Sequence, residues 1–190
     1  MKATGTLIAS IWLVAAMGGD PTGDPDYKHP LIKGVGGIAV VPDAAEPPQA
    51  DAKALLDITS GKKSGKVLKG LDRAALIANQ HAHHEVGLKD GMKMAIVLHG
   101  PATKAALTDK AYIARSSSYA KQSGSVKGNP NLKLLKRLDE LGVEIYVCAQ
   151  AMAHRGIATD EIAPPVQVAG SAATVNINKQ LAGYAYLPFH

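Results

Sequence analysis

The segment from Lys93 to His99 places the strongest constraint on what this chain can fold into. Its run Ala95-Ile96-Val97-Leu98 is uninterrupted and apolar, which is typical of a central parallel strand buried on both faces. Gly100 and Pro101 follow and predict a tight exit into a helix. Because parallel strands are joined by crossover segments, we expect strands and helices to alternate in the rest of the chain.

Strand and helix patterns do alternate from residue 53 onward. A helix of about residues 68–85 has an apolar stripe at helical spacing, and further helices are predicted at 150–154 and 172–181. The order predicts an α/β fold, a three-layer α/β/α sandwich with a mostly parallel sheet of about five strands. Besides 93–99, the predicted strands are Lys53–Ile58, Val143–Cys148, Val166–Ala169 and Tyr184–Leu187.

Local signals set the ends of two helices. Asn129 as N-cap and Pro130 at the first helical position predict a helix that Gly142 terminates. Ser171 is the predicted N-cap of the helix at 172–181. Residues 102–128 are less regular, and the serine clusters at 116–118 and 123–125 indicate a loop.

Four polar side chains stand where predicted strands end. Asp57, His99, Cys148 and Ser171 therefore fall on one edge of the sheet, the edge at which open α/β sheets bind ligands. Cys148 is the only cysteine, and a thiol at the start of a helix is favoured as thiolate by the helix dipole. The alternative is that Cys148 is a small buried hydrophobe and His99 is structural.

His81, His84 and Glu85 are expected to share one helical face. Three side chains of one helix do not close a tetrahedral metal shell. A solvated polar face is the preferred interpretation, so no metal site is predicted.

The N-terminus resembles an export signal. Lys2 precedes an apolar stretch from Leu7 to Ala16, and small residues follow, so residues 1–19 are predicted to be a signal peptide. An uncleaved anchor is the alternative. Export, to the periplasm, makes a cysteine without a partner in its own chain a candidate reactive thiol or intermolecular bridge. A Pro/Gly-rich arm at 20–50 and one domain at 51–190 complete the predicted organisation.

The distribution of charge disfavours nucleic acid as a partner, and the distribution of apolar residues disfavours a membrane span. The net charge is +5, but the lysines are scattered and no basic run is interleaved with aromatic residues, which disfavours nucleic acid. No second long apolar segment follows the first, so no membrane span is expected in the mature chain.

Several motifs together resemble exported DsrE/DsrF-like proteins of the DsrE family. The resemblance covers roughly Leu31 to Phe189, and Cys148 is followed by Arg155-Gly156 at the family's spacing. Relatives of this subgroup often read Cys-Gly-Gln, where this chain has Cys148-Ala149-Gln150. The motifs are Val97–Ala102, Asn129–Leu132, Gly142–Gln150 and the tail at 168–184.

The resemblance implies a three-layer fold, a homo-oligomer such as a trimer, and a sulfur carrier that forms a persulfide on Cys148 without a cofactor. His99 would move a proton or stabilise the thiolate. Gly100, Gln150 and Ser171 would bind a small sulfur anion, and the other partner would be a sulfur donor or acceptor protein.

Two other functions stay open. The first is a cysteine-dependent transferase or hydrolase that uses Cys148 and His99. The second is a non-catalytic exported protein that binds a small ligand or a metal through its histidines.

Overall fold

The computed structural model of the chain describes residues 26–118, 122 and 124–190. Five strands, all parallel, form one sheet in the order β6-β5-β4-β1-β7. The predicted parallel sheet is therefore confirmed, while the predicted signal peptide at 1–19 lies outside the described residues. The strands are β1 (Lys53–Ile58), β4 (Lys93–Leu98), β5 (Glu144–Cys148), β6 (Gln167–Ala169) and β7 (Ala185–Phe189).

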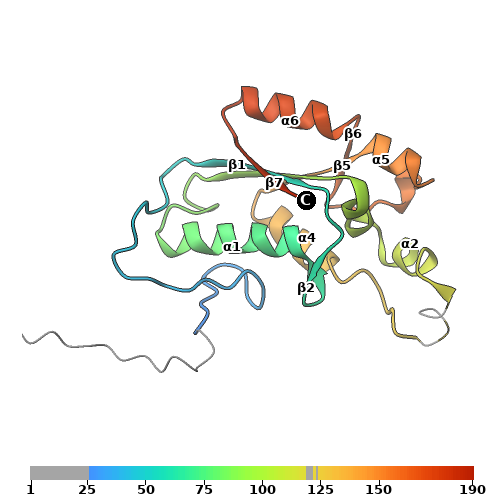
Figure 1. Cartoon of the computed structure of the whole chain (residues 1–190), viewed down its shortest axis with the longest axis horizontal. Coiled ribbons are helices and arrows are strands. Elements are labelled where there is room, and N and C mark those ends of the chain that lie inside the picture. Colours follow the sequence, from blue (N-terminus) through green and yellow to red (C-terminus); the bar gives the residue numbers. More distant parts are fainter. Residues whose placement is uncertain (1–25, 119–121, 123) are drawn as a thin grey trace, which may run out of the picture.

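Helices cover both faces of this sheet, as a three-layer sandwich requires (Figure 1). Helices α1 (Lys69–His83) and α4 (Leu132–Glu140) pack on one face, and α6 (Ala172–Leu181) lies across the other. The short helix α5 (Ala149–His154) begins directly after β5. Shorter elements are η1 (Gly100–Ala106), α2 (Asp109–Ala114), η2 (Thr159–Glu161) and the antiparallel hairpin β2 (Lys63–Ser64) with β3 (Val67–Leu68).

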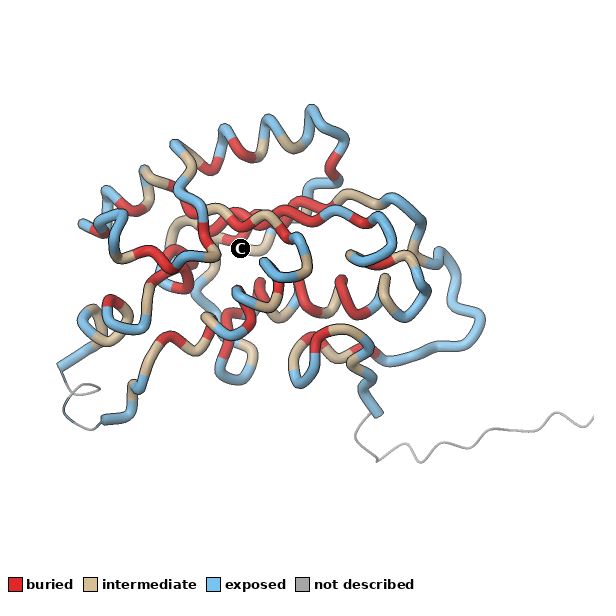
Figure 2. The backbone as a smooth tube through the Cα atoms, turned by 180° about the vertical axis from the view of Figure 1, so that it is seen from behind, coloured by how far each residue is buried: buried red, intermediate tan, exposed pale blue. Residues whose placement is uncertain are grey.

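The two faces of the sheet differ in how they are packed. Strand side chains alternate, so every second residue of β1, β4 and β5 faces α1 and α4, where a large cluster includes Leu56, Ile96 and Leu135. The cluster beneath α6 is smaller and includes Leu55, Val97 and Cys148. Buried residues accordingly gather in the central sheet and on the helix sides turned toward it (Figure 2).

The less regular segment at 102–128 contains α2, whose N-cap Thr108 accepts a hydrogen bond from the Ala111 amide. The predicted start of the next helix was wrong. Helix α4 begins at Leu132 rather than at Pro130. Asn129 is not a cap, because its side-chain Nδ2 donates to the carbonyls of Ala105 and Leu107, 2.8 and 2.6 Å away. In the sequence, an asparagine that caps a helix looks the same as a buried asparagine whose side chain hydrogen-bonds to another loop.

The proposed common face of His81, His84 and Glu85 does not form. Helix α1 ends at His83, and Glu85 has a φ of +58°, outside the helical region. His81 Nδ1 lies 3.0 Å from the Ile77 carbonyl oxygen. In the described part of the chain, no group of three or more His, Cys, Asp or Glu residues is arranged to hold a metal ion.

Part of the predicted arm packs against α1. Asn79 of α1 has an exposed fraction of 0% and accepts hydrogen bonds from the amides of Leu31 and Ile32. Its Nδ2 donates to the carbonyls of Ile32, Val35 and Gly36. One buried side chain thus holds residues 31–36 to the domain. No helix among the described residues has the length and hydrophobicity to cross a bilayer.

Candidate functional site

The order of strands brings the predicted site residues to neighbouring positions. Strand β4 lies between β5 and β1, and Leu98 pairs with Val147. His99 continues β4 with an extended backbone (φ −149°, ψ −177°), so it lies beside Cys148, one strand spacing of about 5 Å away. Both side chains face α6, as does Asp57 of β1.

Cys148 is the last residue of β5 and the N-cap of α5. Its exposed fraction is 5%, and it belongs to the apolar cluster with Ala172 and Val175 of α6. No hydrogen bond joins its thiol to His99 or to another described residue. The thiol is thus shielded by small side chains and is not part of a preformed Cys–His pair.

His99 is held by a buried carboxylate. His99 Nε2 lies 2.6 Å from Asp57 Oδ1, and the exposed fractions of the two side chains are 26% and 6%. A carboxylate accepts hydrogen bonds and does not donate them, so Nε2 of His99 carries the proton of this bond. In a neutral imidazole the other nitrogen, Nδ1, is then an acceptor, and no described residue hydrogen-bonds to it.

Two further side chains hold Asp57 from other elements. Asn176 Nδ2 of α6 and the Tyr186 hydroxyl of β7 donate to Asp57 Oδ2 at 2.9 and 2.7 Å. The hydrogen bond to Asp57, with some burial, raises the pKa of Tyr186 above 10. Since the amide nitrogen of Asn176 must face the carboxylate, its Oδ1 is left buried without a hydrogen-bond partner among the described residues.

The other predicted site residues lie at the same edge but are engaged in structural bonds. The Gly100 carbonyl accepts from Arg155 Nε at 3.0 Å and from Thr103 Oγ1 at 2.8 Å. Gln150 Nε2 donates to the Gly170 carbonyl at 3.3 Å. Ser171 Oγ accepts from the Thr174 amide at 3.0 Å, which confirms the predicted cap. A ligand-binding role for Gly100, Gln150 and Ser171 stays a prediction.

An ion pair fixes the loop that follows α5. Arg115 Nε donates to Glu161 Oε1 at 2.8 Å, and its Nη1 donates to the Arg155 carbonyl at 3.1 Å. The hydrogen bond from Arg115, with one from the Ala158 amide, lowers the pKa of Glu161 to about 2. Arg155 is therefore anchored on both sides, through its own Nε to Gly100 and through its carbonyl to α2.

Sequence reasoning placed Asp57 at this edge without assigning it a role, and it missed Asn176 and Tyr186. A signal for Asp57 was present, because an acidic residue within the apolar segment Ala54–Ile58 is buried only when it is paired. Asn176 and Tyr186 are 119 and 129 residues away from Asp57, and no local pattern connects them.

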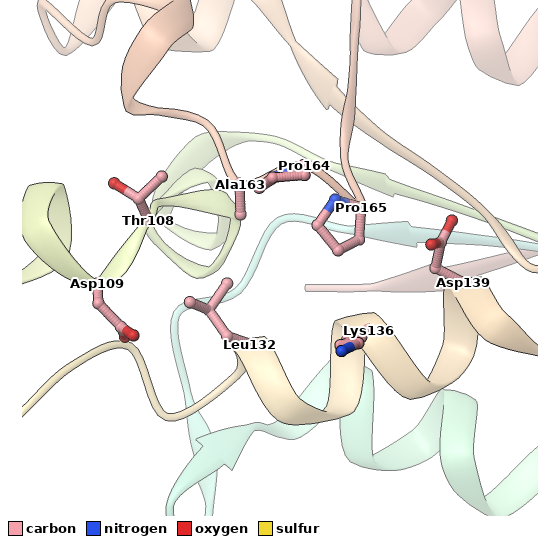
Figure 3. A pocket seen from close by; sticks show the side chains of 8 residues that line it. All are labelled: Thr108, Asp109, Leu132, Lys136, Asp139, Ala163, Pro164 and Pro165. Atoms are coloured by element: carbon pink, nitrogen blue, oxygen red, sulfur yellow. The ribbon is translucent and has the colours of Figure 1, made fainter.

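A hollow of the surface lies away from these residues. It has a volume of about 600 Å³ and opens between α4 and the segment before β6 (Figure 3). Leu132, Ala163, Pro164 and Pro165 form its apolar wall, with Lys136 beside it. Helix α4 is on the opposite face of the sheet from α6, whereas the Cys148 side chain faces α6, so this hollow is not part of the site around Cys148.

The sequence of the domain matches the model of a known family over residues 53–189, which include all five strands. The chain belongs to the DsrE/DsrF-like family. No curated protein sequence matches the chain. DsrE/DsrF-like proteins are generally associated with sulfur relay, which agrees with the general direction of the sequence-based prediction.

Solved structures that are similar to the chain include the following two. The protein of unknown function MTH1491 from Methanobacterium thermoautotrophicum has 14% identity and a TM-score of 0.49, over 72% of this chain and 98% of its own. The ychN protein from E. coli has 16% identity and a TM-score of 0.47, over 73% of this chain and 99% of its own.

Proposed function

We propose that the protein carries sulfane sulfur as a persulfide on Cys148. The observation that carries this proposal is the position of the only thiol of the chain. It lies at the carboxyl end of β5, beside a histidine whose Nδ1 is unengaged, in a family associated with sulfur relay. The protein needs no cofactor for this role, because the reacting atom is Sγ of Cys148 itself.

Loading of Cys148 is a displacement at sulfur. The Cys148 thiolate attacks the outer sulfur of a sulfane donor such as thiosulfate and forms an S–S bond. The bond between the two sulfur atoms of thiosulfate breaks, and sulfite leaves with its electron pair. The products are a Cys148 persulfide anion and sulfite. Attack by an acceptor thiolate on the outer sulfur of the persulfide then transfers that sulfur to the acceptor and releases the Cys148 thiolate.

The burial of the thiol favours small donors. With an exposed fraction of 5%, Cys148 is screened by the cluster that it forms with Ala172 and Val175. A thiosulfate or short polysulfide ion is small enough to approach a thiol at the end of a strand. The persulfide of a folded donor protein would have to displace α5 or α6 to reach Cys148, so we expect small sulfur anions to load the protein faster.

Intact mass spectrometry tests the function. The reduced protein is incubated with thiosulfate or polysulfide, and a gain of sulfur that dithiothreitol removes is expected. The variant Cys148→Ser is the matched control and is expected to gain none. Equal loading of the variant, or no loading of the wild type by any sulfane donor, contradicts the proposal.

A second candidate is supported by the Asp57–His99 hydrogen bond, since a carboxylate that orients a histidine also occurs in cysteine transferases and hydrolases. A stable acyl adduct on Cys148 after treatment with an activated ester, together with release of the acid on turnover, would favour this candidate over the carrier.

We also propose that the chain is exported to the periplasm and that the mature protein is a homo-oligomer. The N-terminal pattern at residues 1–19 supports export. An exposed apolar stripe on α6, with Ile177 and Leu181, supports self-association. N-terminal sequencing of protein from the periplasmic fraction checks export: a mature chain that begins near Gly19 is expected, and an intact Met1 in the cytoplasm contradicts it.

A further inference from the structure

We propose that Asp57 is a positioning residue that holds His99 as the proton acceptor for Cys148. The inference rests on the proposed function, because it assigns the proton that the thiol must lose before it attacks sulfur. In this scheme His99 is the catalytic base, and Asp57 acts through it.

The geometry of Asp57 supports a fixed role. Its carboxylate accepts three hydrogen bonds from three elements: His99 after β4, Asn176 of α6 and Tyr186 of β7. Donors that converge on both oxygens from three elements hold the carboxylate in one orientation. The orientation of the His99 ring is therefore set by the tertiary fold rather than by its own rotamer preference.

The fixed orientation selects one tautomer of His99. With the Nε2 proton committed to Asp57, Nδ1 has the free lone pair. Cys148 is on the adjacent strand and makes no direct hydrogen bond with His99. In the proposed transfer, the proton moves from Sγ to Nδ1 by way of one water molecule. The imidazolium that results lies against the Asp57 carboxylate, which balances its charge while the thiolate reacts.

The other charged groups near His99 are hydrogen-bonded to partners outside the His99–Asp57 pair. Arg155 donates a hydrogen bond to the Gly100 carbonyl, and the His190 ring is hydrogen-bonded to Thr59 Oγ1 at 2.9 Å. Tyr186 faces Asp57 from β7, and along α6 the next charged side chain, Lys179, is paired with Glu144. Asp57 is the carboxylate in direct contact with His99, so its neutralisation is the change to test.

Nuclear magnetic resonance of ¹⁵N-histidine-labelled protein reads the tautomer directly. The His99 signals are identified by their loss in His99→Gln. In the wild type we expect a protonated Nε2 and an unprotonated Nδ1 at neutral pH. Asp57→Asn should shift the tautomer toward a protonated Nδ1, whereas Tyr186→Phe, which leaves the carboxylate in place, should not. A wild-type His99 protonated on Nδ1 alone overturns the proposal, whether or not Asp57→Asn folds.

The pH profile of the thiol reaction tests the coupling to Cys148. The rate of modification by methyl methanethiosulfonate, and of loading by thiosulfate, should show an inflection from His99 in the wild type. His99→Gln should lose it and react about a hundredfold more slowly, the lower end of general-base contributions. Asp57→Asn should show the same loss. Profiles of both variants that superimpose on the wild type overturn the inference.

The two proposals can fail separately. If thiosulfate and polysulfide never load Cys148, the carrier function fails, but the methanethiosulfonate profile and the tautomer still report on Asp57 and His99. If Cys148 loads to the same extent and at the same rate in Asp57→Asn, the carrier stands and the role of Asp57 is refuted.

Discussion

At the scale of single residues, a second, half-buried polar network lies under α6. Glu144 of β5 accepts hydrogen bonds from Lys179 Nζ at 2.6 Å and from the Tyr146 hydroxyl at 2.6 Å. Tyr184 donates to the same carboxylate at 3.3 Å, and Lys179 also lies 5.1 Å from the centre of its ring. Burial alone would raise the pKa of Glu144, but the hydrogen bonds from Lys179 and Tyr146 outweigh it, and the pKa is lowered.

The same network makes Tyr146 a weaker acid than an ordinary tyrosine. Burial first, and then its hydrogen bond to Glu144, raise the pKa of Tyr146 from 10.0 to about 12. Because the folded-state pKa is raised, the contribution to stability is fully present below about pH 10 and is lost as the pH rises toward 12.

We predict that Glu144→Gln lowers the pKa of Tyr146 only part of the way back to 10.0, because burial, the larger cause, remains. Site-specific ¹³C resonances of tyrosine Cζ, followed against pH, measure the change. Glu140→Gln, in the exposed pair with Arg137, is the matched control and should leave Tyr146 unchanged. An unchanged titration in Glu144→Gln would show that the network does not influence Tyr146.

At the scale of elements, α6 is attached to the sheet by polar side chains more than by apolar ones. Ala172 and Val175 are the buried residues of this helix, and both are small. Asn176 and Lys179 reach from its inner side to Asp57 and Glu144. Helix α1, in contrast, buries an apolar stripe that includes Leu71 and Ala75, as its sequence predicts.

Asn79 illustrates how one buried side chain attaches a whole segment. Its amide makes five hydrogen bonds with the backbone of residues 31–36, which have no regular secondary structure. Gly36 lies so close to the backbone of α1 at Leu76 that a Cβ there would overlap it, and its φ of +58° also favours glycine.

We predict that Asn79→Ala lowers the free energy of unfolding by about 2–4 kcal/mol, because several backbone groups lose their partners. Release of residues 31–36 into water would recover part of this cost, and limited proteolysis should then cut the chain before β1. Denaturant unfolding measures the loss, with the exposed helical asparagine in Asn178→Ala as control. A variant as stable and as protease-resistant as the wild type would refute the role of Asn79.

At the scale of the whole molecule, the outer surface of α6 exposes two large apolar side chains. Ile177 and Leu181 stand one helical turn apart, with exposed fractions of 57% and 83%. Large apolar side chains on the outer side of a helix with a polar inner side indicate a contact with another molecule. A second copy of this chain is the occupant that we propose.

We predict that the wild type is a homo-oligomer at micromolar concentration and that Ile177→Asp with Leu181→Asp converts it to a monomer. Introducing charge into the apolar contact opposes its burial. Light scattering after gel filtration measures the mass. Val41→Asp alters an exposed valine of the arm and should leave the mass unchanged. A monomeric wild type contradicts the prediction.

The order of strands and helices could be predicted from the sequence because its signals are local. These signals are the spacing of apolar residues and the glycine and proline residues at the ends of elements. The uninterrupted run Ala95–Leu98 and the alternation in Val143–Cys148 identified β4 and β5. Glycine and proline after β4, and glycine before β5, marked where each element ends. Since these strands are parallel, their carboxyl ends meet at one edge, so the sequence alone assigns His99 and Cys148 to the same edge of the sheet.

Only the tertiary structure decided which of these residues touch. The lateral order of strands depends on how the crossover helices pack, and no local pattern encodes it. That order put β4 between β5 and β1, so His99 lies between Cys148 and Asp57, and its side chain hydrogen-bonds to Asp57. It also placed α6 over the strand ends, which buried the thiol and brought Asn176 to Asp57. The sequence determined which chemical groups reach the edge of the sheet, and packing determined their partners.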